Sequence, residues 1–405
     1  MDTTTPSVNG TAYLRWMLAT AALLVAAVGA VNIAVDPLGV FGSPRIAGVD
    51  AVKPHFDHYR ELTHWKAAQR QCARTGIFGN SRAEIGLNPA SPPLLAHGLA
   101  AYDHAVPGTG ADLSYRQLKW LDEAGCMPHT VFLGVDFFDF LGGRAAGPMR
   151  TLDADPPPRF DARFVEEEVL SVTGLQDSLQ TLSIQHARHP DILTELGFNP
   201  LDNYLDEVAQ SGAYTLFRQK AQDNIANWRR QPPRIHPATG GPSDSEQAVD
   251  AFVARAQAAH TKVYLLIYPY HAEARLIVER LGLGALFAQW KKEMVDLAAR
   301  HAGPDAEVEL WDFSGLSPQT LEPIPPPGDR HTQLRWFWEA GHFKQSLGEL
   351  AVDRMLGAPN GFGIRLDGSN VDDWVARDRA QVQALMATPS PLLAEVDSLL
   401  PPGRP

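Results

Sequence analysis

The stretch IFGNSRAEIG, residues 77–86, runs from apolar and small residues into Ser81, which is followed directly by Arg82. A serine hydroxyl is a poor nucleophile unless a base takes its proton and a third group orients that base. Ser81 follows a predicted strand and precedes a predicted helix, and ligands of open α/β sheets gather at such strand ends. The same position suits a serine that only caps the helix. This stretch alone therefore leaves Ser81 either a nucleophile or an N-cap.

The stretch WFWEAGHFKQSLGELAVDRML, residues 336–356, could supply the base and its orienting acid. Glu339 precedes His342 by three residues, a spacing at which a tight turn can bring a carboxylate to an imidazole. The carboxylate would fix the tautomer and stabilise the imidazolium formed when the histidine takes the serine proton. Asp312, at the end of a predicted strand, is the alternative acid. A structural or solvated histidine is the competing interpretation of His342.

Short apolar runs alternate with amphipathic stretches from residue 75 onward, which is typical of crossover units and a parallel sheet. Strands are predicted near residues 75–79, 100–105, 130–135, 262–268 and 307–312. About 125 residues separate the third and fourth strands, too many for an ordinary crossover, and much of this segment has helical periodicity. The predicted fold is therefore a three-layer α/β domain with a parallel sheet of about five strands and a helical insertion at about 141–235.

An apolar run from Trp16 to Val35 is long enough to span a bilayer as one helix. A signal peptide cleaved after Val28 and Ala30 is the alternative, although its apolar stretch should be shorter. We predict a cytoplasmic tail at 1–12, a transmembrane anchor at 13–35, a linker and first helix at 36–70, the α/β domain at 71–357 and a C-terminal helical tail at 358–405.

The candidate residues and their order resemble the SGNH (GDSL-like) hydrolase superfamily, particularly membrane-anchored extracytoplasmic members linked to cell-envelope polysaccharides. FGNSR matches the first family block at Ser81, and AVPGTG supplies Gly108 as the second. FLGVDFFDF stands where the third block belongs, and EAGH gives Glu339 and His342. The resemblance implies that Ser81 is the nucleophile, His342 the base and Glu339 its orienting acid.

The resemblance also assigns the oxyanion hole, where this chain departs from the family. It implies that Gly108 and Asp136 line the hole, but the family usually has a hydrogen-bond-donating asparagine at the position of Asp136. An ionised aspartate only accepts hydrogen bonds. Either the backbone N–H groups of Ser81 and Gly108 suffice, or another donor such as Arg82 enters. Asn80 also replaces the usual aspartate before the serine.

Other motifs give weaker signals. YPYHAEAR places His271 after the fourth predicted strand, at the same sheet end as Ser81, so we expect it to line the site. His55, His58 and His64 lack metalloprotease spacing and are interpreted as exposed helix histidines, so no metal site is predicted. PGTGAD lacks the remaining glycine of a dinucleotide fingerprint and the lysine of a phosphate loop, so no cofactor is expected.

The two cysteines offer evidence about the compartment. Cys72 lies nine residues before Ser81, at the end of the first predicted strand. Cys126 lies ten residues before Asp136, at the end of the third. In a flavodoxin-like order these strands are neighbours, so both cysteines should meet at the other end of the sheet and form a disulfide. Two buried, reduced thiols are the alternative. A disulfide is expected only outside the cytosol.

The predicted function is ester chemistry on an extracytoplasmic glycan, either hydrolysis by an esterase or transfer by an O-acyltransferase through an acyl-serine. An inactive SGNH-like scaffold or glycan-binding protein is the alternative, favoured by Asp136. We expect a single-pass protein of the inner (cytoplasmic) membrane with its large domain in the periplasm. The formal net charge of −12 leaves no basic stripe for phosphates, so nucleic acid is not an expected partner.

Overall fold

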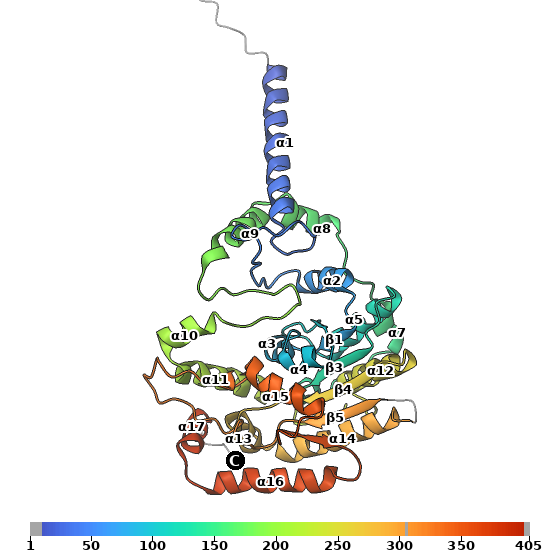
Figure 1. Ribbon diagram of the computed structural model, residues 1–405, viewed down its shortest axis with the longest axis vertical. Helices are drawn as coiled ribbons and strands as arrows, with labels where there is room; N and C mark the ends of the chain where they lie inside the picture. The colour runs from blue at the N-terminus through green and yellow to red at the C-terminus, as the bar shows by residue number, and fades with distance from the viewer. Residues whose placement is uncertain (1–9, 304–306, 401–405) are drawn as a thin grey trace, which may run out of the picture. The chain divides into compact units, whose positions relative to one another are not determined.

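The computed structural model describes residues 10–303 and 307–400, which fall into two compact units (Figure 1). The first unit holds the described residues up to Thr63 together with Pro158–Ile192, and the second holds His64–Pro157 and the described residues from Leu193 onward. Part of the predicted helical insertion, Pro158–Ile192, therefore belongs to the same unit as the N-terminal segment. Residues 1–9 of the predicted cytoplasmic tail lie outside the described residues.

The first unit contains one long apolar helix and several short ones. Its elements are α1 (Gly10–Val35), α8 (Ala162–Phe164), the π-helix η1 (Val165–Val169), α9 (Val172–Ser183) and the 3-10 helix η2 (Ile184–His186). With a mean hydropathy of 2.3, α1 is long and apolar enough to cross a membrane. Near its end, Asn32 donates hydrogen bonds to the carbonyls of Glu168 and Val169, at 3.1 and 2.9 Å. The last turns of α1 therefore pack on η1 and α9.

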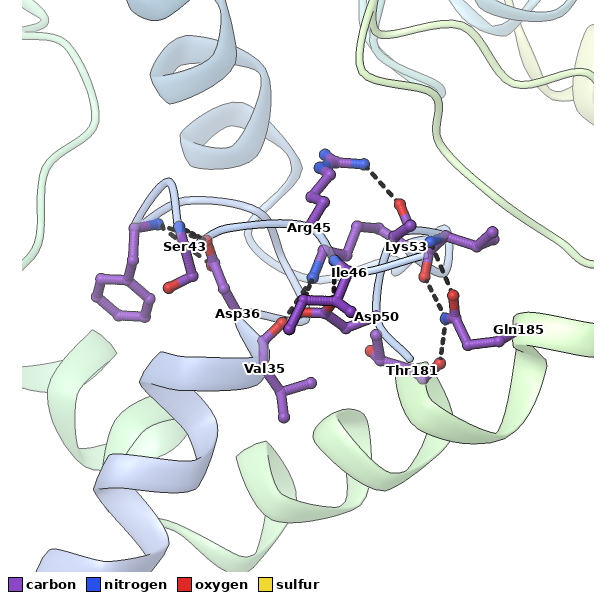
Figure 2. A network of polar contacts seen from close by, with 12 residues as sticks. Val35, Asp36, Ser43, Arg45, Ile46, Asp50, Lys53, Thr181 and Gln185 are labelled. Carbon is purple, nitrogen blue, oxygen red and sulfur yellow. Dashed lines mark hydrogen bonds and ion pairs between the residues drawn. The ribbon is translucent and has the colours of Figure 1, made fainter. Parts of the chain in front are cut away.

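The segment after α1, predicted as a linker, is a hydrogen-bonded loop (Figure 2). The carboxylate of Asp36 accepts hydrogen bonds from the backbone N–H groups of residues 40–43, at 2.8–3.2 Å. Lys53 Nζ donates to the carbonyl of Val35, at the C-terminus of α1, at 2.6 Å. A cation at this position satisfies an end carbonyl of the helix and complements its dipole. The loop is thereby attached to the end of the apolar helix.

The second unit is built on a six-stranded sheet with the order β2-β1-β3-β4-β5-β8. Its strands are β1 (Thr75–Phe78), β2 (Ala101–Asp103), β3 (Thr130–Val135), β4 (Lys262–Ile267), β5 (Val308–Asp312) and β8 (Ile364–Leu366). The first five are parallel, which confirms the predicted strands and their orientation. The sixth pairs antiparallel with β5. It lies in the segment that the sequence predicted as a helical tail, so the sheet is larger than expected.

Helices surround this sheet, and a separate hairpin lies between β5 and β8 in the sequence. The hairpin strands are β6 (Phe337–Glu339) and β7 (His342–Phe343). The helices are α3 (Ser81–Gly86), α4 (Pro92–Ala96), α5 (Ala111–Glu123), α6 (Phe137–Phe140), α7 (Met149–Ala154), α10 (Tyr204–Ser211), α11 (Ala213–Arg230), α12 (Asp244–Ala258), α13 (Ala272–Arg280), α14 (Gly284–Arg300), α15 (Gln345–Met355), α16 (Val371–Ala387) and α17 (Pro391–Leu399). Helix α2 (Arg60–Gln71) runs across the boundary between the units.

The predicted disulfide is present. Cys72 and Cys126 are bonded, with their Cα atoms 5.1 Å apart. Strands β1 and β3 are neighbours, and each cysteine lies just before one of them, at the end of α2 and of α5. The nearly equal offsets from the strand ends therefore predicted the pair correctly.

Buried charges attach the C-terminal helix α16 to the core. Lys291 on α14 is fully buried and lies 2.8 Å from Asp312 and 2.9 Å from Asp378, the latter on α16. Arg275 on α13 also pairs with Asp378, at 2.9 Å. Buried charges are tolerated only when they are paired in this way. The predicted tail is thus an integral part of the second unit.

Candidate active site

Ser81, His342 and Glu339 form a hydrogen-bonded chain in the second unit. Ser81 Oγ lies 2.8 Å from His342 Nε2, and His342 Nδ1 is hydrogen-bonded to Glu339 Oε1. Because an ionised carboxylate can only accept, Nδ1 carries the proton and Nε2 is left to accept the serine hydroxyl proton. This is the arrangement that activates a serine nucleophile.

The β6–β7 hairpin holds the acid beside the base. Glu339 and His342 are paired across the hairpin, and only Ala340 and Gly341 connect the two strands. Glu339 Oε2 also accepts a hydrogen bond from the backbone N–H of Gly341, at 2.5 Å. The carboxylate is therefore held at both oxygens, and the tight turn expected from the three-residue spacing is present.

The turn between β1 and α3 presents Ser81. Gly79 has a φ of +147°, and a Cβ at this position would lie 2.2 Å from Tyr268 Oη, so no other residue fits there. Asn80 follows as the N-cap of α3, its side-chain oxygen accepting from the backbone N–H of Arg82 at 3.1 Å. The capping role considered for Ser81 thus falls to Asn80, and the serine hydroxyl is left to His342.

Asp136, at the end of β3, acts as an acceptor and not as a donor. Its carboxylate accepts hydrogen bonds from Arg82, from Asn80 Nδ2 at 3.1 Å and from Tyr270 Oη at 2.7 Å. It also caps α6 through the backbone N–H of Phe138, at 3.2 Å. All of these partners require an ionised carboxylate or suit one well. Asp136 therefore fixes the residues around Ser81 and has no proton to offer a substrate.

Asp139 lies one turn along α6 from Asp136, whose charge affects it. Burial and the neighbouring charge of Asp136 raise the pKa of Asp139 well above its ordinary value. Its side chain lies 3.5 Å from Asn80 Nδ2 and lines the cavity beside Ser81. This shift favours the protonated form, and a protonated carboxyl can donate as well as accept hydrogen bonds.

A polar cavity of about 560 Å³ opens beside Ser81 and His342. Side chains that can form hydrogen bonds or ion pairs dominate its wall: Arg82, Thr109, Asp112, Asp139, Arg144, Lys220, Asn224, Asp244 and Ser245. Arg82 lies over the rings of Phe138 and Tyr270, at 5.9 and 5.4 Å from their centroids. The cavity thus offers both donors and acceptors next to the nucleophile.

One wall of the cavity comes from α11, which the sequence analysis had not connected with the site. Lys220, Asn224 and Trp228 line the cavity from successive turns of this helix. Trp228 stacks on Phe138 with their centroids 3.7 Å apart, which fixes α11 against the end of β3. The i, i+4, i+8 spacing of these residues on one face was the available sequence signal.

Gly108 also lines the cavity, as predicted, and has a φ of +73°. Within the part of the chain that the structure describes, the backbone N–H groups of Ser81 and Gly108 have no hydrogen-bond partner. Unpaired backbone N–H groups beside a nucleophile are suitable donors for a developing oxyanion.

Comparison with known proteins finds no matching family model, no matching curated protein and no matching solved structure. The site is therefore interpreted from its own geometry.

His271 and Asp312 lie outside this cavity. His271 is buried between Phe217 and Phe337, its Nδ1 accepts from the backbone N–H of Glu273, and its Nε2 is hydrogen-bonded to the carbonyl of Glu322. Both ring nitrogens are used, and burial lowers its pKa to about 4. The expectation that His271 lines the site is therefore wrong, and the preceding Tyr270 reaches Asp136 instead. Asp312 is bound to Lys291, so it is not the acid partner of His342.

The environment of Glu339 favours its ionised form. Burial raises the pKa of this carboxyl, but the positive charge and hydrogen bond of His342, assisted by Lys220, outweigh burial and hold the pKa below its ordinary value. Glu339 is thus a carboxylate wherever the protein is near neutral pH. It can stabilise an imidazolium at His342.

Proposed function

We propose that the second unit is a serine-dependent esterase or O-acyltransferase acting on acyl esters of an extracytoplasmic glycan. The observation that carries this proposal is the 2.8 Å contact between Ser81 Oγ and His342 Nε2, with Glu339 on the far side of the imidazole. No other group reaches both the hydroxyl and an orienting carboxylate in the described part of the site.

In the first half-reaction Ser81 Oγ attacks the ester carbonyl while His342 Nε2 takes the hydroxyl proton. The carbonyl oxygen becomes an oxyanion that the backbone N–H groups of Ser81 and Gly108 can bind. His342 then returns the proton to the leaving alcohol oxygen as the carbon–oxygen bond breaks. The product is an acyl ester of Ser81 and a free hydroxyl group.

In the second half-reaction His342 removes a proton from the acceptor. The acceptor oxygen attacks the acyl carbon, the tetrahedral intermediate collapses, and His342 returns the proton to Ser81. Water as the acceptor gives an esterase, and a sugar hydroxyl gives an acyltransferase. The two outcomes differ in whether the released acyl group appears as a free acid or on a second glycan.

The cavity wall supports a hydroxyl-rich substrate. Asn224 is buried, and its Nδ2 has no hydrogen-bond partner in the described part of the chain. A buried amide left unpaired costs free energy that a ligand can recover by accepting its hydrogen bond. Asp139, Thr109 and Lys220 add further polar groups around the same space. Such a surface suits sugar hydroxyls better than an aliphatic chain.

Two features support an extracytoplasmic location. The Cys72–Cys126 disulfide is of a kind that persists in oxidising compartments. Helix α1 could anchor the chain in the inner membrane with a single crossing. Together they favour a domain held at the periplasmic face of that membrane.

A fluorophosphonate probe tests the proposed nucleophile. Labelling is expected at Ser81 in the full-length protein in detergent, and Ser81→Ala should abolish it. Ser245→Ala is the matched control, because Ser245 lines the same cavity but donates its hydroxyl to the carbonyl of Asp139, at 2.7 Å. Absence of labelling in folded wild-type protein would favour the inactive, glycan-binding scaffold instead.

A further inference from the structure

Three side chains of the first unit converge away from the candidate active site. His58 comes from the segment before α2, Glu168 from the π-helix η1 and Asp177 from α9. One ligand atom from each lies within 4.8 Å of the other two. His58 Nε2 is 3.0 Å from Asp177 Oδ2 and 3.5 Å from Glu168 Oε2. Three separate segments thus direct one nitrogen and two carboxylates at one point.

These separations match the edges of a metal coordination shell. Ligand atoms at 2.0–2.2 Å from a tetrahedral Zn²⁺ lie about 3.3–3.6 Å apart. The two separations involving His58 Nε2 fall at or just below this range. A cation between the three side chains therefore requires only small movements of their ends.

Glu168 supplies a second, independent observation. Its exposed fraction is 7%, and its Oε2 lies 3.5 Å from His58 Nε2 without a hydrogen bond from that or any other described residue. A buried carboxylate oxygen without a hydrogen bond is costly unless a cation lies near it. The turn that carries Glu168 is a π-helix, a local irregularity that often occurs at functional sites.

We propose that His58, Glu168 and Asp177 bind a divalent transition-metal cation, with Zn²⁺ the best match. One imidazole and two carboxylates suit Zn²⁺ and its neighbours, whereas Mg²⁺ and Ca²⁺ prefer oxygen ligands alone. His58 is partly exposed, with 37% of its side chain accessible, so water can complete the coordination. The two carboxylate charges balance the charge of the ion.

The site would have a structural effect within the first unit. The ion would join the segment before α2 to both η1 and α9, the elements on which Asn32 of α1 is held. The sequence analysis interpreted His55, His58 and His64 as exposed helix histidines because their mutual spacing fits no metal motif. His64 is instead buried. The residues that His58 contacts, Glu168 and Asp177, lie more than 100 positions away in the sequence.

Metal content of the full-length protein tests the proposal directly. The protein is purified in detergent without a histidine tag, stripped with a chelator, and titrated with Zn²⁺. We expect one tightly bound equivalent by elemental analysis and a higher melting temperature in its presence. Co²⁺ should give visible absorption bands typical of nitrogen and oxygen ligands. Thiolate bands are not expected, because both cysteines are in the disulfide.

Matched variants locate the ion. Glu168→Gln and Asp177→Asn should each weaken Zn²⁺ binding at least ~10-fold. Glu167→Gln should bind normally, because Glu167 is its neighbour in η1 but pairs with Tyr59 and Arg163. Wild-type protein that binds no equivalent of Zn²⁺ or Co²⁺, or Glu168→Gln protein that binds as tightly as wild type, would overturn the site. The Co²⁺ spectrum of wild-type protein decides the matter if the ligand variants do not fold.

Discussion

The carboxylate of Asp136 pairs with the guanidinium of Arg82, the residue that directly follows Ser81. Both side chains are largely buried, with exposed fractions of 1% for Asp136 and 12% for Arg82. The pair connects the end of β3 to the first turn of α3. Ser81 is thus flanked by a charge pair on one side and by the N-cap Asn80 on the other.

Asp136→Asn tests this pairing against the family resemblance. The resemblance would predict a restored oxyanion donor and higher activity. The structure predicts the reverse, because an amide removes the negative charge from Arg82 and presents an N–H group to the donors around it. We expect a loss of about 3 kcal/mol in the free energy of unfolding, measured by urea denaturation, and weaker labelling of Ser81.

Asp139→Asn is the companion variant. Because burial and the charge of Asp136 favour the protonated form of Asp139, an amide of similar shape should change the free energy of unfolding by less than about 1 kcal/mol. Equal destabilisation by the two substitutions would mean that Asp139, like Asp136, stabilises the folded protein as a charged group.

Glu339→Gln should lower turnover of an ester substrate by roughly 10²–10⁴-fold, because the amide no longer fixes the Nδ1–H tautomer of His342 or stabilises its charge. Glu349→Gln on α15, outside the cavity, serves as the control. A Glu339→Gln enzyme with wild-type kcat would mean that another group orients the base.

The pH dependence of stability gives an independent measure of Glu339. Its folded-state pKa lies below the ordinary value of 4.5, so ionisation stabilises the folded protein. This contribution is complete above about pH 4.5 and is lost as the pH falls through the folded-state pKa. The difference in unfolding free energy between wild type and Glu339→Gln should therefore shrink on acidification. A difference that grows on acidification would mean that the folded-state pKa of Glu339 is raised and not lowered.

Asn224→Ala should affect substrate binding more than folding. The Nδ2 group of Asn224 has no partner among the described residues, so its removal should leave the melting temperature unchanged or raise it slightly. If a glycan ester accepts this hydrogen bond, KM should rise roughly 3- to 10-fold. Asn227→Ala, on the exposed side of the same helix, should change neither quantity.

Asp378→Ala should destabilise the second unit by about 3–5 kcal/mol, because it leaves the buried Lys291 and Arg275 without one of their partners. Asp372→Ala, on the same helix, breaks an exposed pair with Lys292 and should cost at most about 1 kcal/mol. Urea denaturation of both variants measures the difference. Similar costs would mean that α16 is not held by the buried cluster.

The sequence predicted the parts of the site that depend on local spacing. Ser81 was identified from the strand-to-helix change, and Glu339 with His342 from a three-residue interval that fits a hairpin turn. The disulfide followed from nearly equal sequence offsets to the ends of two neighbouring strands. The site residues depend on spacing within a few residues. The disulfide depends on the order of the parallel strands, which the alternation of strands and helices along the chain constrains strongly.

The parts that sequence reasoning missed depend on where distant segments pack. The spacing of Lys220, Asn224 and Trp228 places them on one face of α11, but only the long-range contact of Trp228 with Phe138 directs that face to the cavity. Strand β8 is three residues long, too short to show alternation, and is defined by its pairing with β5. His271 was displaced from the site by its role as the N-cap of α13, which its sequence position equally allowed.

The two contacts of His342 differ greatly in the length of chain that each one closes. Its contact with Glu339 spans three residues, whereas its contact with Ser81 spans 261. The acid–base pair can form as soon as the hairpin does, but the serine joins it only after the chain has completed a closure of very high contact order. Partial opening that separates β1 from the hairpin would therefore break the contact between Ser81 and His342 while most of the sheet remains folded. Covalent labelling of Ser81 would therefore report whether this long-range contact is intact.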